Sequence, residues 1–342
     1  EPFLDGGVTN EDSNWDDAFW KTHALSSNAQ GEAVIHCETE KSGFHAAFAM
    51  TSKAVKLKND SRQPLEATSH GSNASKAHCA FTTKLDRGEQ VVLEKYVGIF
   101  SSLQEQKESI ATRAHDSSRK AGVRGFEQLK ADHTQAWSKI WNRGDIEIKG
   151  DVPSQQAIRF NVFHLNQTYR GDDPRLNIGP KGFTGEKYGG ASYWDTEAYC
   201  LPFFLAGHES KVSRQLLMYR YNHLERAIEN AEKLGFSDGA ALYPMVTMNG
   251  EECHNEWEIT FEEIHRNGAM AYAIWNYVNY TGDREYLLSN GFEVLLAIAR
   301  FWSQRVQWSS EKEAYVILGV TGPNEYENNV NNNFYTNYTR FK

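Results

Sequence analysis

The spacing of apolar residues changes along the chain, and this change limits the folds open to it. Residues 1–100 carry short apolar runs, such as 33–35 and 46–50, separated by polar and glycine-containing turns. Such runs are typical of antiparallel β structure. Beyond Pro153 the apolar residues recur every three or four positions, as they do over 264–278, which is typical of amphipathic helices. The sequence therefore predicts a β domain followed by a helical domain.

The stretch between these regions predicts a helical linker. From Ser101 the chain becomes rich in charged residues, glutamine and alanine, and this stretch ends in Trp137 and Trp141, which lie four positions apart and therefore share one helical face. The expected parts are the β region 1–100, the linker 101–143 and the helical region 144–342.

The charge balance and the cysteines exclude several classes of protein. The 342 residues include 36 Lys or Arg and 45 Asp or Glu, a formal net charge of −9, without a long basic run. Clustered cations bind phosphate backbones, so we expect no nucleic-acid partner. No apolar stretch reaches the length of about 18 residues that a membrane span needs. No C-x-x-C pair suggests a disulfide scaffold or zinc knuckle. The sequence thus predicts a cytoplasmic protein that binds neither nucleic acid nor membranes.

Aromatic residues make up 13% of the chain. Either they fill the core, or some of them form a carbohydrate-binding surface on which flat rings stack against sugar C–H faces. Three long loops between the expected helices combine polar and aromatic residues, namely 179–194, 242–257 and 319–333. Function usually resides in such loops.

The first loop leads into Trp194-Asp195-Thr196-Glu197. An aromatic plane next to a carboxylate provides what a sugar ring needs, a face to stack on and acceptors for its hydroxyl groups. The alternative is that Asp195 or Thr196 caps the next helix and Trp194 lies in the core. The glycines that precede this segment match no phosphate-binding motif.

The second loop, 249–258, combines four carboxylates with one imidazole and one indole. Cys253, His254 and His265 lack an established metal-ligand spacing, so we expect no metal there. A solvated acidic loop is the alternative. The mixture of donors, acceptors and one flat ring suits a polyhydroxyl ligand better than a cation.

The third loop contains Gly322-Pro323-Asn324, a turn that projects Glu325 from a rigid loop. We expect the neighbouring Tyr326 to reduce the exposure of Glu325 to water. A carboxylic acid desolvated in this way keeps its proton near neutral pH and can act as a general acid. The alternative is an exposed turn glutamate among asparagines.

In this order, the three loops resemble glycoside hydrolase family 65, a family of disaccharide phosphorylases. The resemblance is carried by G-x-x-Y-x-G…Y-W-D-T-E-x-Y-x-L-P-F-F at 185–204, N-G-E-E-C-x-x-x-W-E-I-T-x-E-E-x-H-x-N-G at 249–268 and G-P-N-E-Y at 322–326. It implies an N-terminal β-sandwich, to which 1–100 contributes, then the linker, and an all-α (α/α)6 barrel whose loops form a sugar pocket.

The resemblance also implies roles for single residues. Glu325 is the general acid, and Trp194 and Asp195 form the floor of the glucosyl subsite. Trp257 is a second sugar platform. The acceptor-selecting loop is similar to that of family members acting on maltose, and it consists of His254, Asn255 and Glu256.

The implied reaction is an inverting phosphorolysis of an α-glucosyl disaccharide, with maltose and phosphate giving β-D-glucose 1-phosphate and D-glucose. Phosphate attacks the anomeric carbon from the face opposite the departing sugar, and it needs no partner carboxylate because it is already an anion. No metal or organic cofactor is implied, and a homodimer is left open. The alternatives are an inverting hydrolase of the same family that cleaves trehalose, and an inactive sugar-binding fragment.

An (α/α)6 barrel needs about twelve helices, whereas the sequence after Pro153 predicts about five. We therefore expect the barrel to be incomplete, with 144–342 as its N-terminal half. The resemblance implies that the family's phosphate-binding residues lie beyond Lys342. Half a barrel exposes the apolar faces of its helices, so we expect the isolated chain to aggregate or to lack activity.

Overall fold

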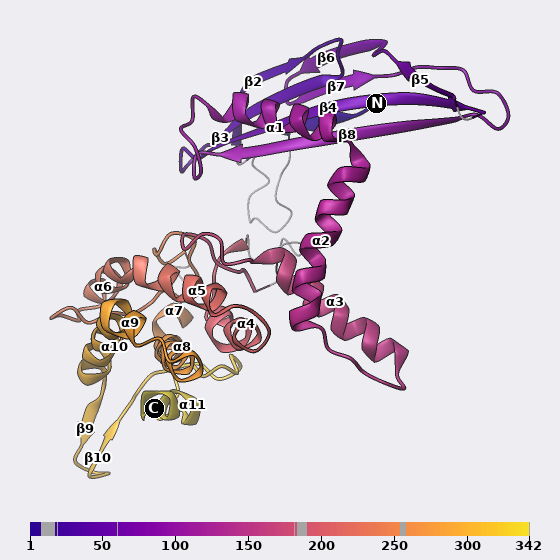
Figure 1. The fold of residues 1–342 in the computed structure, drawn as a ribbon. Helices are drawn as coiled ribbons and strands as arrows, with labels where there is room; N and C mark the ends of the chain where they lie inside the picture. The colour runs from indigo at the N-terminus through magenta and orange to yellow at the C-terminus, as the bar shows by residue number, and fades with distance from the viewer. Residues whose placement is uncertain are drawn as a thin grey trace. The chain divides into compact units, whose positions relative to one another are not determined.

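The fold is described from a computed structural model, which places residues 1–7, 18, 20–59, 61–180, 182, 190–253 and 258–341. The chain forms two compact units, Glu1–Ser138 and Lys139–Lys342 (Figure 1). Within the described ranges, no helix is both long enough and apolar enough to cross a membrane.

The N-terminal unit contains two antiparallel sheets. In the larger sheet, β4 is the central strand: β8 pairs along one of its edges, and β3 and β5 pair along the other, with β2 outside β3. The smaller sheet has the order β1-β7-β6. The strands are β1 (Phe3–Asp5), β2 (Trp20–Ser27), β3 (Glu32–Thr39), β4 (His45–Lys58), β5 (Ser61–Leu65), β6 (Ser69–Asn73), β7 (Lys76–Ala80) and β8 (Gln90–Ser101).

The alternation of side chains along β3 builds two apolar layers. Ala33, Ile35 and Cys37 are buried on one face together with apolar residues of β4 and β7, so the two sheets share a core. The opposite face packs against helix α1 (Ile110–Arg124). Gly98 on β8 permits this close contact, because a Cβ atom there would lie 2.2 Å from the carbonyl oxygen of Ala114. Helix α2 (Phe126–Gly144) follows.

The C-terminal unit is mainly helical, which confirms the predicted change from a β-rich domain to a helical region. Pro153 lies in the first turn of α3, whose preceding residue Asp151 caps the helix by accepting a hydrogen bond from the Ser154 amide at 3.1 Å. The elements are α3 (Val152–Thr168), the π-helix η2 (Thr196–Cys200), α4 (Leu201–Gly207), α5 (Ser210–Asn222), α6 (Leu224–Lys233), α7 (Ile259–Glu262), α8 (His265–Thr281), α9 (Arg284–Tyr286), the π-helix η3 (Leu287–Gly291), α10 (Phe292–Arg305), β9 (Gln307–Ser309), β10 (Ala314–Val316) and α11 (Phe334–Phe341).

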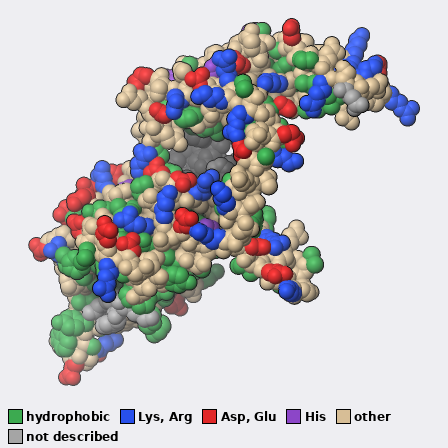
Figure 2. All heavy atoms as spheres, viewed as in Figure 1, with side chains coloured by type: hydrophobic (Ala, Val, Ile, Leu, Met, Phe, Trp, Pro, Cys, Tyr) green, Lys and Arg blue, Asp and Glu red, His purple; other side chains and the backbone are tan. Residues whose placement is uncertain are grey.

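Helix α8 lies in the middle of this unit and contacts α5, α10, α11 and η2. Its apolar residues Met270, Ala273, Ile274 and Tyr277 belong to the main hydrophobic core. The predicted helix is present, but Trp275 of the predicted apolar spacing is 55% exposed, so the buried face is rotated from the predicted one. Other large apolar side chains remain exposed, and Figure 2 shows hydrophobic side chains on the part of this unit that contains β9 and β10. These exposed residues include Trp275, Trp308, Tyr315 and Phe334.

Candidate active site

Two loops hold Trp194 and Asp195 in place. The amide of Ser192 donates to the carbonyl oxygen of Thr247 at 2.7 Å, and the amide of Thr247 donates back at 3.1 Å. On the other side of the pair, Thr196 starts the π-helix η2 and its hydroxyl donates to the carbonyl oxygen of Ile178 at 3.0 Å. Single π-helical turns are frequent at functional sites. The segment is therefore anchored on both sides of the predicted sugar-binding pair.

A buried ion pair lies behind this segment. Arg220 on α5 donates to both carboxylate oxygens of Glu197, at 2.8 and 3.0 Å, and also to the carbonyl oxygen of Tyr193 at 3.0 Å. Both charged side chains are almost completely buried. Because Tyr193 and Glu197 lie on either side of Trp194 and Asp195, this bidentate contact fixes the backbone that carries the two residues.

Trp194 contacts aromatic side chains from two other helices. Its ring meets that of His265, at the start of α8, edge to face at a centroid distance of 5.0 Å. Tyr335 on α11 lies 6.1 Å from Trp194 and 5.5 Å from His265. Burial, followed by the charge of Arg266, lowers the pKa of His265 to about 4, so the imidazole is neutral near pH 7. Trp194 itself is half-buried against the core, which leaves part of its ring accessible.

A cavity of about 480 Å³ lies beside this aromatic cluster, between η2, α8 and α11. Its lining is largely aromatic and includes Tyr199, Tyr272, Trp275, Tyr335 and Tyr338.

The third predicted loop is anchored at its two ends. Val320 and Val330 exchange two backbone hydrogen bonds of 2.8 Å. The carboxylate of Glu262, at the end of α7, accepts from the Thr321 hydroxyl at 2.5 Å and from the Asn329 amide at 2.8 Å. These contacts anchor the loop of Glu325 at the end of α7.

The expected shielding of Glu325 by Tyr326 is wrong. Tyr326 is 94% exposed, and Glu325 is exposed as well. The anchors lie at the ends of the loop, so the chain between them projects into solvent and the two consecutive side chains do not cover each other.

A buried carboxyl group at this position belongs instead to Glu263, which the sequence interpretation did not single out. Glu263 is 1% exposed and lies between α7 and α8, within hydrogen-bonding reach of the Glu325 carboxyl group. Burial and the charge of Glu325 raise the pKa of Glu263 to about 8, while Arg266 acts in the opposite direction and Asp195 adds a smaller upward effect. Glu263 therefore holds a proton near neutral pH and can donate it to Glu325.

Arg266 supplies a fixed positive charge next to this pair. Its guanidinium group donates to the carbonyl oxygens of Tyr243 at 2.5 Å, Thr260 at 2.6 Å and Glu263 at 2.9 Å. Burial lowers its pKa to about 10, which leaves the group charged at pH 7. The three carbonyl contacts connect Tyr243 and the α7 segment to the start of α8.

The predicted acceptor-selecting residues fall outside the described residues. These are His254, Asn255, Glu256 and Trp257. The chain before them is fixed, because the buried carboxylate of Glu252 accepts from the amides of Met245 at 2.6 Å and Val246 at 3.1 Å. Their roles stay predictions, as do those of Trp194, Asp195 and Glu325. Of these last three, Asp195 and Glu325 both act electrostatically on the buried carboxyl group of Glu263.

Comparison with known proteins shows the family to which the chain belongs. Residues 1–140 match the glycosyl hydrolase family 65 N-terminal domain, and residues 159–341 match the central catalytic domain of the same family. The chain therefore belongs to glycosyl hydrolase family 65.

Individual members of the family are similar to most of the chain. The chain is 48% identical over 340 residues to "Maltose phosphorylase" of Bacillus subtilis (strain 168), an alignment that covers 98% of this chain and 43% of the relative. It is 36% identical to "Alpha,alpha-trehalose phosphorylase" of Thermoanaerobacter brockii over 74% of this chain and 32% of the relative. A solved structure described as a kojibiose phosphorylase from the human microbiome matches with a TM-score of 0.84 at 28% identity, over 99% of this chain and 43% of that one. The chain thus spans less than half the length of these relatives.

Proposed function

We propose that this chain is part of an inverting disaccharide phosphorylase that acts on maltose and inorganic phosphate. The observation that carries the proposal is the 48% identity to the maltose phosphorylase over nearly the whole chain. Relatives named for trehalose are 36% and 40% identical, and relatives named for kojibiose are 34–39% identical, each over 75% or less of this chain. In this proposal the helical unit belongs to an (α/α)6 barrel that the chain does not complete, and the β-rich unit contributes to an N-terminal sandwich.

In the proposed reaction, Glu325 gives its proton to the glycosidic oxygen as the bond from this oxygen to the anomeric carbon breaks. Phosphate forms the new bond to that carbon from the opposite face, so the α-glucoside becomes β-D-glucose 1-phosphate and D-glucose departs. The proton lost by the phosphate group replaces the proton that Glu325 has given up. An acid and an anionic nucleophile are sufficient for this chemistry.

We further propose that Glu263 supplies the proton that Glu325 gives to the glycosidic oxygen. Burial keeps a proton on the Glu263 carboxyl group at neutral pH, and this group lies next to Glu325. When a bound sugar removes water from Glu325, the proton moves to Glu325, and Arg266 stabilises the negative charge that develops on Glu263. Glu263 is thus a positioning residue that keeps Glu325 ready to act as an acid.

The sugar contacts are proposed on the same basis. Trp194 offers a partly accessible ring, and the adjacent Asp195 offers acceptors for glucosyl hydroxyls. We assign acceptor selection to His254, Asn255 and Glu256, with Trp257 as a second platform.

Replacement of Glu325 tests the catalytic assignment. In the purified protein that carries this chain, Glu325→Gln is expected to reduce turnover of maltose by at least about 100-fold and to leave maltose binding intact, since only the transferable proton is lost. Glu327→Gln is the matched control, because Glu327 is an exposed carboxylate on the same loop. Turnover that survives in Glu325→Gln would remove Glu325 from the role of acid.

A panel of substrates tests the activity itself. Maltose, trehalose and kojibiose are each incubated with and without inorganic phosphate, and sugar phosphate and free glucose are both measured. We expect sugar phosphate from maltose only when phosphate is present. Free glucose without sugar phosphate under both conditions would identify a hydrolase, and binding without turnover of any of the sugars would identify a binding fragment.

A further inference from the structure

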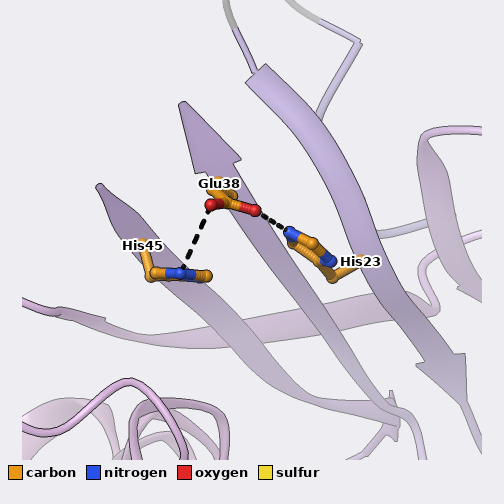
Figure 3. Close-up of side chains that lie close together, drawn as sticks. All are labelled: His23, Glu38 and His45. Carbon is orange, nitrogen blue, oxygen red and sulfur yellow. Dashed lines mark hydrogen bonds and ion pairs between the residues drawn. The ribbon is translucent and has the colours of Figure 1, made fainter. Parts of the chain in front are cut away.

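A second cluster of polar side chains lies in the N-terminal unit. His23, Glu38 and His45 each bring one ligand atom to within 4.8 Å of the others. Figure 3 shows Glu38 between the two imidazoles, with one carboxylate oxygen directed toward each of them. Nε2 of His23 contacts one oxygen directly, and Nε2 of His45 lies 3.7 Å from the other. Among the residues that the structure places, this group alone combines three His, Cys, Asp or Glu ligand atoms so closely.

The sheet brings these residues together from three strands. Glu38 on β3 is directly opposite His45 on β4 in the antiparallel register. The pairing of β2 with β3 shifts between Thr22 and Ala24, so His23 lies at a bulge. A bulge turns a side chain away from its regular direction and is often found beside a site. Since the three residues come from different strands, their approach depends on the register of the sheet.

We propose that His23, Glu38 and His45 bind a divalent transition-metal ion of the zinc class. Two imidazoles and one carboxylate, with a position left for water, form a recurrent zinc ligand set. Zinc bonds of about 2.0–2.2 Å place tetrahedral ligand atoms ~3.4 Å apart, close to the 3.7 Å between His45 and Glu38. The side chains of His23 and Glu38 are 34% and 31% exposed, which gives them room to exchange their mutual hydrogen bond for bonds to the ion.

A fourth residue orients one of these ligands. Nε2 of His36 lies 3.1 Å from Nδ1 of His45. When the proton of neutral His45 resides on Nδ1 and is donated to His36, the lone pair of Nε2 faces Glu38 and is free to bind the ion. Zinc-binding histidines usually donate their second ring N–H to a neighbouring acceptor, which fixes the tautomer and the orientation of the ring.

The cluster is accessible from solvent. Glu38 and His45 line an open cavity of about 630 Å³, together with Gly43 and residues 102–107. The amide of His45 donates to the Ser102 hydroxyl at 3.0 Å, which ties one ligand strand to the segment after β8. An ion at this position would connect β2, β3 and β4 and would stabilise the N-terminal unit.

Equilibrium dialysis against Zn²⁺ tests the proposal, with the purified protein free of any histidine tag and first stripped with a chelator. We expect one equivalent to bind, and we expect His45→Ala and Glu38→Gln each to weaken binding at least tenfold. His70→Ala is the matched control, because His70 is an exposed histidine of the same unit outside the cluster. Cobalt as a second probe should give the intense visible absorption of a tetrahedral site in the wild type and in His70→Ala only.

Glu38→Gln keeps the shape of the side chain, so it serves as the test if His45→Ala fails to fold. Circular dichroism of the metal-free variants measures whether they are folded. The proposal is overturned if the wild-type protein binds no zinc at 100-fold excess over protein, or if folded Glu38→Gln binds zinc as tightly as the wild type.

Discussion

The buried carboxyl group of Glu263 makes the pH dependence of stability the most informative property to measure. Its pKa is about 8 in the folded protein and 4.5 without the influence of the fold. Below pH 4.5 both states carry the proton, and the folded state has no disadvantage. Above pH 4.5 the unfolded state loses the proton while the folded state retains it, so folding becomes less favourable until the pH passes about 8.

The size of this effect on the free energy of unfolding follows from the titration of a single proton. The free energy of unfolding should fall by up to about 1.4 kcal/mol per pH unit over this interval, and by up to roughly 5 kcal/mol in total. This total is an upper bound, because relaxation of the fold and entry of water reduce the cost of a buried charge. The Glu263→Gln variant cannot ionise at this position, so its stability should depend less steeply on pH and exceed that of the wild type most clearly near pH 8.

Denaturant unfolding at pH 5, 6, 7 and 8 measures how steeply the free energy of unfolding depends on pH in the wild type and in Glu263→Gln. Glu327→Gln is the exposed-carboxylate control. The same variants report on catalysis. Loss of Glu263 should change the pH profile of kcat, because the titration of Glu263 with its pKa of about 8 would no longer contribute to the profile. Identical stability slopes for the wild type and Glu263→Gln, together with unchanged pH profiles, would refute the reasoning.

Three further predictions concern other parts of the chain. Gly98→Ala should destabilise the N-terminal unit by about 2–4 kcal/mol, because the added Cβ would overlap the Ala114 carbonyl oxygen. A thermal melt measures the expected decrease in Tm. Glu197→Gln should destabilise the protein by about 3–5 kcal/mol in urea unfolding, because it leaves the buried cation of Arg220 unpaired. An effect smaller than that of an exposed-carboxylate variant would contradict the stabilising role of this ion pair. Trp194→Ala should raise KM for maltose by at least about tenfold through loss of the ring face, with an unchanged circular dichroism spectrum as the check on folding.

Much of the architecture could be predicted from the sequence because it is encoded locally. The spacing of apolar residues over 264–278 is a property of one helix, and α8 covers most of that range. The turn at 322–324 likewise determines that Glu325 projects from its loop. Both patterns depend on neighbours along the chain, which a sequence displays directly.

The features that the sequence did not predict depend on contacts between distant segments. Glu263 is buried because α7, α8 and the loop of Glu325 meet around it, and its own neighbours along the chain look like an exposed acidic pair. A recognisable signal was its place directly before Ile264, the first residue of the predicted apolar face. His23 and Glu38 approach His45 only through strand order and a bulge, neither of which can be derived from apolar spacing.

The most direct test of the proposed function is the anomeric configuration of the product. Proton NMR of the purified protein with maltose and inorganic phosphate records the anomeric configuration of the sugar phosphate, which is fixed because its anomeric oxygen is esterified and cannot mutarotate. The proposal predicts β-D-glucose 1-phosphate and D-glucose in equal amounts, with no product when phosphate is left out. Formation of α-D-glucose 1-phosphate, or of glucose alone without any need for phosphate, would contradict it.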